Sequence, residues 1–229
     1  MSYQLVFFDL DGTLLDFETA QVESLIATLQ AFNLPSHDTI VADYIRINHT
    51  CWQQMEHGEL EASRIPQIRI STLFLQYGIT ADVDAFNAHY RDTFAGNAIL
   101  IDGATDILRY AQGRPNLQVV ALTNGLKNMQ HDRLRNANIA KYFDAVYTSE
   151  ELDSFKPHTA MFVRAYEKLG LPLTQRNALI VGDSLTSDIK GGNDFGIDTC
   201  WYNPNGQANP GGPTPVYQIA VLNELKRIL

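Results

Sequence analysis

Short apolar runs separated by helical patterns limit most strongly how this chain can fold. A continuous apolar run of this length is typical of a strand buried on both faces. Between the runs, residues 104–111 and 160–169 place apolar side chains at helical spacing. Alternating strands and helices predict a doubly wound, mostly parallel sheet, an α/β fold with a Rossmann-like core. The apolar runs occupy residues 5–8, 117–122, 145–147, 178–181 and 199–202.

The segment from residue 17 to residue 96 breaks this alternation, because nothing in it is typical of a strand. We therefore predict an all-helical cap (17–96) inserted after the first strand of a core formed by residues 1–16 and 97–229. The alternative is that these helices pack directly on the sheet. Helical spacing in the cap recurs at about residues 22–32, 38–55, 60–77 and 82–94.

The C-terminal segment begins with residues 203–215, which are dense in Pro, Gly and Asn. Such a composition sustains neither a helix nor a strand, so we expect a surface loop. A final helix is predicted at about residues 216–229.

Composition and charge narrow the classes of function. Of the 229 residues, 45% are hydrophobic, and the formal net charge is −9. A globular protein with this charge lacks the basic character of proteins that bind nucleic-acid polymers or acidic membranes. No apolar stretch approaches the roughly 18 residues of a membrane span, and Cys51 and Cys200 have no metal-ligand spacing. We expect a cytoplasmic protein with a small-molecule partner, while the sequence leaves its oligomeric state open.

Two carboxylates follow the first apolar run in the sequence Asp9-Leu10-Asp11-Gly12-Thr13. In an extended chain, residues two apart point the same way, so Asp9 and Asp11 would converge at the carboxyl end of a strand. Two adjacent anions are costly unless a cation or a proton offsets them, and Mg²⁺ prefers such oxygen ligands. The alternative is a loop with two solvated acids.

Later segments place polar side chains at the ends of other predicted strands. Thr123, Asn124 and Gly125 follow the second run and can offer hydrogen-bond donors to a phosphate, although the same three residues also suit a plain turn. Lys156 follows the third run and can bind phosphate oxygens as a point charge.

The fourth run is followed by Asp183 and, five residues later, by Asp188. Asp183 could be a simple helix cap. Taken together, however, the four segments are more specific than any one of them, because each follows a predicted strand of one parallel sheet.

These segments resemble the four motifs of the haloacid dehalogenase-like hydrolases, and the helical insertion is similar to the small cap of that family. The resemblance implies that Asp9 is the nucleophile and Asp11 the general acid/base. It also implies that Thr123 and Lys156 bind the phosphoryl oxygens. Asp183 would bind Mg²⁺ together with Asp9 and the backbone carbonyl of Asp11, and Asp188 would support that metal site.

The resemblance favours phosphate esters as substrates. Family members that cleave carbon–halogen bonds lack an acid at the place of Asp11, because halide leaves without a proton, and phosphonate-cleaving relatives lack it as well. The implied reaction is hydrolysis of a phosphate monoester through an aspartyl-phosphate on Asp9.

Within the family, residues 48–58, 123–125 and 191–203 resemble the YjjG-type pyrimidine 5′-nucleotidases. This implies a nucleoside 5′-monophosphate as substrate, with Asn124 and Gly125 in the binding site and Trp52 stacked on the base. The alternative for Trp52 is a place in the core of the cap. Arg46, Arg64 and Arg69 are candidate cap cations near the substrate, although most such arginines are solvated.

Three other functions stay open. The substrate could be a non-nucleotide metabolite such as a sugar phosphate or phosphoglycolate. The enzyme could instead be a phosphomutase, or the chain could bind a phosphorylated metabolite without catalysis. The sequence argues against a nucleoside-triphosphate enzyme of the P-loop type, because no GxxxxGK[ST] occurs in the chain.

Overall fold

The computed structural model describes residues 3–172 and 177–229. Contacts within the chain divide the protein into two compact units. The core consists of the residues up to Asp16 and from Leu100 onward, and the cap spans Phe17–Ile99. The sequence places the second boundary after residue 96, whereas the contacts place it after Ile99.

The core contains a six-stranded sheet in the order β3-β2-β1-β4-β5-β6, and every neighbouring pair is parallel. The prediction of a doubly wound parallel α/β fold is therefore confirmed. In the register, Phe8 pairs with Ala121 of β2 and Val181 of β4, so these three strands end close together. The strands are β1 (Leu5–Phe8), β2 (Gln118–Thr123), β3 (Ala145–Thr148), β4 (Ala178–Gly182), β5 (Asp198–Tyr202) and β6 (Tyr217–Ile219).

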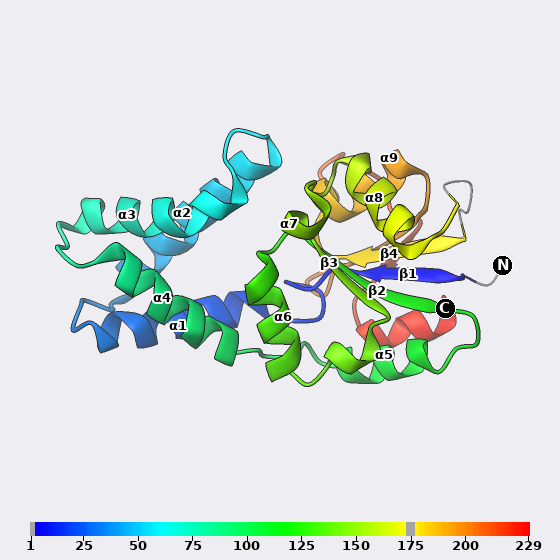
Figure 1. Cartoon of the computed structure of the whole chain (residues 1–229), viewed down its shortest axis with the longest axis horizontal. Helices are drawn as coiled ribbons and strands as arrows, with labels where there is room; N and C mark the ends of the chain where they lie inside the picture. The colour runs from blue at the N-terminus through cyan, green and yellow to red at the C-terminus, as the bar shows by residue number, and fades with distance from the viewer. Residues whose placement is uncertain (1–2, 173–176) are drawn as a thin grey trace. The chain divides into compact units, whose positions relative to one another are not determined.

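Helices cover both faces of this sheet, as Figure 1 shows for α5 on one face and α8 and α9 on the other. All four residues of β1 are fully buried, and their side chains alternate between the faces. Leu5 and Phe7 join a cluster with Phe162 of α8, while Val6 and Phe8 join the cluster on the α5 side. Burial on both faces explains why the strands appear as continuous apolar runs. The core helices are α5 (Ala104–Gln112), α6 (Lys127–Asn136), α7 (Ser149–Leu152), α8 (Thr159–Leu169) and α9 (Lys190–Phe195).

The predicted final helix at 216–229 is wrong. Residues Tyr217–Ile219 form the edge strand β6, which pairs with β5, and Leu222–Arg227 form a short 3-10 helix. Leu222 and Leu225 are fully buried against the core, and their spacing of three residues suits a 3-10 turn. The segment between β5 and β6 contains neither helix nor strand, as predicted.

The cap is helical throughout its described residues. Helix α1 packs on α4, and α2 packs on α3, around buried aromatic residues such as Tyr44, Phe86 and Tyr90. Gly78 ends α3 at a φ of 62°, a left-handed conformation that glycine adopts at no steric cost. The cap helices are α1 (Phe17–Ala31), α2 (Asp38–Glu56), α3 (Ile65–Tyr77) and α4 (Val83–Gly96), with a 3-10 turn at Ala62–Arg64.

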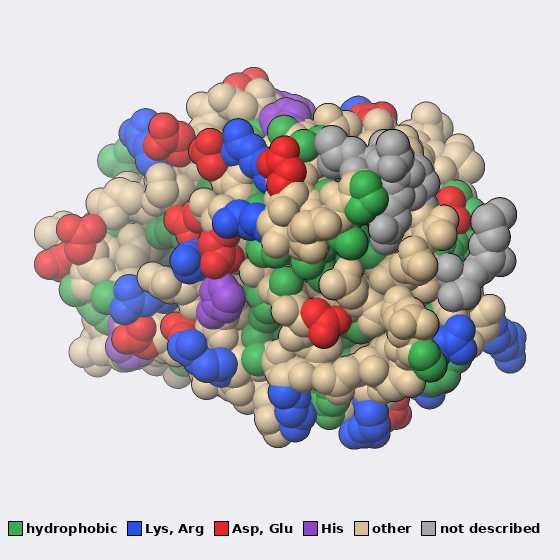
Figure 2. Space-filling model, turned by 45° about the vertical axis from the view of Figure 1, so that its right-hand side comes forward, with side chains coloured by type: hydrophobic (Ala, Val, Ile, Leu, Met, Phe, Trp, Pro, Cys, Tyr) green, Lys and Arg blue, Asp and Glu red, His purple; other side chains and the backbone are tan. Residues whose placement is uncertain are grey.

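Charged side chains of both signs lie on the face shown in Figure 2. Acidic and basic side chains are interspersed there, so this face is not uniformly basic. None of the helices that the structure describes has the length and apolar character needed to cross a membrane. The cytoplasmic location stays a prediction.

Candidate active site

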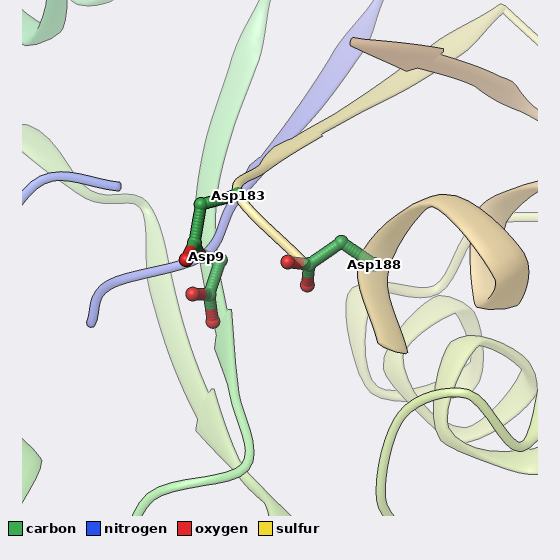
Figure 3. A group of neighbouring side chains, drawn as sticks. All are labelled: Asp9, Asp183 and Asp188. Atoms are coloured by element: carbon green, nitrogen blue, oxygen red, sulfur yellow. The ribbon is translucent and has the colours of Figure 1, made fainter. Parts of the chain in front are cut away.

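Three carboxylates meet at the carboxyl edge of the sheet. Asp9 follows β1 and Asp183 follows β4, and these strands are parallel neighbours. Asp188 lies in the π-helical turn Leu185–Ile189, which begins shortly after the end of β4. One oxygen of each carboxylate lies within 4.8 Å of the others, and the three side chains point toward one another (Figure 3).

Lys156 joins two of these carboxylates. Its Nζ donates to Asp9 Oδ1 at 2.5 Å and to Asp188 Oδ1 at 2.6 Å, and its side chain is 1% exposed. Asn124 positions the lysine: its side-chain Oδ1 accepts from the Lys156 backbone N–H at 2.8 Å, and its Nδ2 donates to the Lys156 carbonyl at 2.9 Å. The predicted substrate residue Asn124 thus uses its amide group on the backbone of Lys156.

The electrostatics of the cluster reflect an excess of buried negative charge. Burial raises the pKa of Asp9 well above its usual value, against the opposing effect of Lys156. Burial, and then the charge of Asp188, raise the pKa of Asp183 to about 7. Burial acts to lower the pKa of Lys156, but Asp188 and Asp9 outweigh it, so this pKa is raised and the lysine is charged. One ammonium group does not balance three carboxylates.

Two glycines let the chain approach these acids closely. A Cβ at Gly12 would lie 2.5 Å from Asp183 Oδ2, and Gly12 also has a φ of 81°. A Cβ at Gly182 would lie 2.2 Å from the Asp188 carboxyl group. Any side chain at either position would displace an acid, so both glycines are required by the packing of the cluster.

The donor set of this cluster fits a hard divalent cation. The side chains of the cluster offer carboxylate oxygens as ligands, and a cation with two positive charges would offset the excess negative charge. The Asp183 loop is fixed from two sides: Thr13 Oγ1 donates to Asp183 Oδ1 at 3.2 Å, and Trp201 Nε1 donates to the Asp183 carbonyl at 2.8 Å. Sequence reasoning missed this role of Trp201, for which no local pattern exists.

Thr123 lies at the end of β2 and is 2% exposed. Its Oγ1 accepts from the Gly125 backbone N–H at 3.1 Å and from Gln130 Nε2 at 3.4 Å. A Cβ at Gly125 would lie 2.0 Å from Gln130 Nε2, so the turn after β2 packs directly on α6. The structure thus places Gly125 against Gln130.

The hydrogen-bond partners of the Asp11 carboxylate lie outside the acidic cluster. Its Oδ2 accepts from Gln130 Nε2 at 2.5 Å, and its Oδ1 forms an ion pair with Arg133 Nη1. Both partners lie on α6, and neither was singled out in the sequence. The only signal available was a glutamine and an arginine three residues apart on the helix that follows the Thr123 turn.

A comparison with protein families decides the relationship of this chain to known proteins. The model of the haloacid dehalogenase-like hydrolases matches residues 3–196, which is most of the chain. The chain belongs to the haloacid dehalogenase-like hydrolases.

Several relatives of this hydrolase resemble it along their whole length. The HAD-hydrolase YfnB of Bacillus subtilis is 35% identical over 99% of this chain and 95% of its own. The pyrimidine 5′-nucleotidase PynA of Streptococcus pneumoniae is 33% identical over 98% of this chain and 94% of its own. The pyrimidine 5′-nucleotidase YjjG of Escherichia coli is 29% identical over 100% of this chain and 99% of its own.

Solved structures agree with the fold. A crystal structure of YfnB bound to magnesium superimposes with a TM-score of 0.90 at 34% identity, covering 100% of this chain and 99% of that one. An L-2-haloacid dehalogenase from Xanthobacter autotrophicus has a TM-score of 0.76 at 18% identity over 99% and 98% of the two chains. The second likeness is one of fold alone.

The cap of this hydrolase contains a pocket of about 340 Å³. Trp52 lines it and is partly exposed, so this tryptophan is not a fully buried core residue. The pocket combines aromatic, acidic and basic side chains, among them Phe17, Glu18, Gln21, Arg46, His49 and Trp52.

A chain of hydrogen bonds lies behind this cap pocket. Arg69 Nη1 donates to Asn48 Oδ1 at 3.0 Å, and Asn48 Nδ2 donates to Gln21 Oε1 at 3.2 Å. Gln21 Nε2 then donates to Glu18 Oε2 at 2.7 Å. Arg69 is 9% exposed and lies over the rings of Tyr44 and Tyr90. It is therefore a buried cation that orients the polar wall of the pocket, not a solvated one.

Proposed function

We propose that this hydrolase is a Mg²⁺-dependent phosphatase that hydrolyses phosphate monoesters through an aspartyl-phosphate on Asp9. The observation that carries the proposal is the cluster of Asp9, Asp183, Asp188 and Lys156 at the edge of the sheet, in which only Asp183 is partly exposed. Asp9 and Asp183 would bind Mg²⁺, together with the backbone carbonyl of Asp11, and Asp188 would orient Lys156. When bound, the cation would offset the negative charge of the phosphate beside the acids.

The residues of this chain can carry both halves of the reaction. A carboxylate oxygen of Asp9 forms a bond to phosphorus while the bond from phosphorus to the ester oxygen breaks. Asp11 gives a proton to the leaving oxygen and then takes one from the water that hydrolyses the acyl phosphate, which regenerates Asp9. Thr123 and Lys156 would bind the oxygens of the transferred group, where the lysine offsets their charge.

The substrate that we propose is a nucleoside 5′-monophosphate. Support comes from PynA and YjjG, two pyrimidine 5′-nucleotidases that match this chain along nearly all of their length. The aromatic and polar lining of the cap pocket suits a planar base with N–H and C=O groups at its edge. The N-acylneuraminate-9-phosphatases, at 23–24% identity over 98% of this chain, keep a sugar phosphate as the second candidate.

A screen of monophosphates with Mg²⁺ or with EDTA tests this proposal. We expect phosphate release from pyrimidine nucleoside 5′-monophosphates, with sugar phosphates and phosphoglycolate slower, and loss of nearly all activity in EDTA. Release from sugar phosphates alone would favour the second candidate. Isomerisation without phosphate release would identify a phosphomutase, and binding without any turnover would refute catalysis.

The same screen needs a metal-binding control without substrate. Mg²⁺ should raise the thermal midpoint, because it binds the folded carboxylate cluster and not the unfolded chain. The pKa of Asp183 is raised to about 7, so a proton competes with the metal below that pH. The stabilisation by Mg²⁺ should therefore be larger at pH 8 than at pH 6, and no stabilisation at either pH would count against the metal site.

Replacing Trp52 by Ala tests the cap pocket. If the indole stacks on the base, its loss removes about 1–3 kcal/mol of binding. The KM for pyrimidine monophosphates should then rise roughly 5- to 150-fold, with a smaller change for ribose 5-phosphate, in steady-state assays. Trp52→Phe keeps an aromatic face and serves as the control. Equal changes in KM for both substrates would show that Trp52 does not recognise the base.

A further inference from the structure

The Asp11 side chain is bound at both oxygens by helix α6. Gln130 Nε2 donates to Oδ2 at 2.5 Å, and Arg133 Nη1 pairs with Oδ1. We name these two residues the Asp11 clamp. Arg133 is fully buried, whereas the side chain of Asp11 is 27% exposed. The clamp therefore holds a solvent-accessible carboxylate from its buried side.

Helix α6 is itself well anchored, so the clamp can define a position. Leu134, one residue after Arg133, is fully buried in the core cluster that also contains Phe8 and Leu10. Gln130 is 2% exposed and contacts both Thr123 Oγ1 and the position of Gly125. The clamp thus links the turn after β2 to the turn after β1.

The hydrogen bonds of the clamp leave room for proton transfer. An ionised carboxylate offers about four acceptor positions on its two oxygens, and the clamp uses one on each. Each oxygen of Asp11 keeps a lone pair that can carry a proton to a leaving group or accept one from water. The clamp therefore restricts the orientation of the carboxylate without blocking its chemistry.

We propose that Gln130 and Arg133 are positioning residues that orient Asp11 for proton transfer; this inference rests on the proposed function. A carboxylate on a glycine-containing turn can otherwise rotate between solvent and the site, and misplacement of a reacting group by about 1 Å can cost 100-fold in rate. The alternative to a positioning role is a structural one, in which the ion pair between Arg133 and Asp11 only stabilises the packing of α6.

Four variants separate these two roles. Gln130→Met and Arg133→Met keep much of the side-chain volume and remove the donors. Arg133→Lys keeps the positive charge and a donating nitrogen but loses the planar guanidinium group. Arg135→Met is the matched control, because Arg135 lies on the same helix, is 68% exposed and pairs with Asp132.

The measurements are steady-state kinetics with a pyrimidine nucleoside monophosphate and the burst of p-nitrophenolate from p-nitrophenyl phosphate, both with Mg²⁺. We expect Gln130→Met and Arg133→Met to lower kcat about 10- to 100-fold while KM changes less than about 2-fold. The burst should stay near one equivalent per chain, because an activated leaving group needs no proton. Arg133→Lys should recover part of kcat, and Arg135→Met should match the wild type.

A double variant gives the sharpest check. Adding Arg133→Met to Asp11→Asn should lower kcat no further, because the inference has Arg133 act on catalysis through the Asp11 carboxylate. A further loss equal to that of Arg133→Met alone would overturn the inference.

Other outcomes also decide the question. Unchanged kcat in both methionine variants would overturn the inference while leaving the phosphatase proposal intact. A burst that falls in proportion to kcat would show a loss of active protein, and hence only a structural role. If the wild type hydrolyses no phosphate ester, the proposed function fails, and the inference fails with it.

Discussion

Replacing Asp9 by Asn is expected to abolish turnover while the fold stays intact. The neutral amide has nearly the same shape as the carboxylate but cannot form the acyl phosphate. Phosphate release by the purified variant should therefore fall by a factor on the order of 10⁴ or more. A colorimetric phosphate assay with Mg²⁺ measures this, and intact-mass analysis excludes deamidation back to aspartate.

The stability of the same variant provides an internal check. Burial raises the pKa of Asp9, so the ionised form is disfavoured in the folded state. The contribution of Asp9 to the free energy of unfolding is therefore fully present below the pKa that Asp9 has in the unfolded chain. This contribution is lost as pH rises through the higher pKa that Asp9 has in the folded protein. Without Mg²⁺ at pH 8, the thermal midpoint of Asp9→Asn should therefore equal or exceed that of the wild type.

A matched control for Asp9 is Asp106→Asn, which makes the same chemical change at an exposed position of α5. It should keep wild-type activity. Turnover by correctly folded Asp9→Asn protein at more than a few per cent of the wild-type rate would refute the nucleophile assignment. Transfer of a phosphoryl group to the wild-type chain alone, detected after an acid quench, would support it.

The Asp11→Asn variant should lose activity in a way that depends on the leaving group. General acid–base catalysis contributes about 10²- to 10⁴-fold, and an alkyl oxygen needs the proton that nitrophenolate does not. Release of the leaving group in the first turnover should therefore slow by about 10²- to 10⁴-fold for a nucleoside monophosphate and far less for p-nitrophenyl phosphate. Rapid-quench measurement of the first turnover separates this step from hydrolysis of the acyl phosphate.

The opposite pattern for Asp11 would be informative. Equal slowing of the first turnover for both substrates would count against an acid role. Retention of full activity would point to proton transfer by another group, and the clamp on α6 would then have no catalytic purpose.

The core fold and the meeting of the acids could be predicted from the sequence for one physical reason. Strands buried on both faces are continuously apolar, so β1 and β4 can be recognised in the sequence as short apolar runs. In a parallel sheet their carboxyl ends share an edge. Asp9 and Asp183 follow those ends directly, and their proximity is a consequence of local sequence plus sheet topology.

The C-terminal segment could not be predicted in the same way. The apolar residues Tyr217, Ile219, Leu222 and Leu225 satisfy a strand spacing and a helical spacing in turn. What decides between them is the free edge of β5, which offers backbone partners to β6. That partner lies outside the segment itself.

The Asp11 clamp could not be recognised from the sequence for a related reason. An arginine on a polar helix is usually exposed, whereas Arg133 is buried and forms an ion pair with Asp11, 122 residues away in the chain. The position of Trp201 beside the Asp183 loop and the chain from Arg69 to Glu18 likewise depend on partners distant in sequence.

The amino-acid sequence by itself determined the parallel core, the helical character of the insertion and the acids at the strand ends, because these follow from periodicity and from the order of strand and loop. Only the tertiary structure decided which donors surround each acid and which arginines are buried. Those choices depend on contacts between side chains far apart in the chain, and no local pattern encodes them.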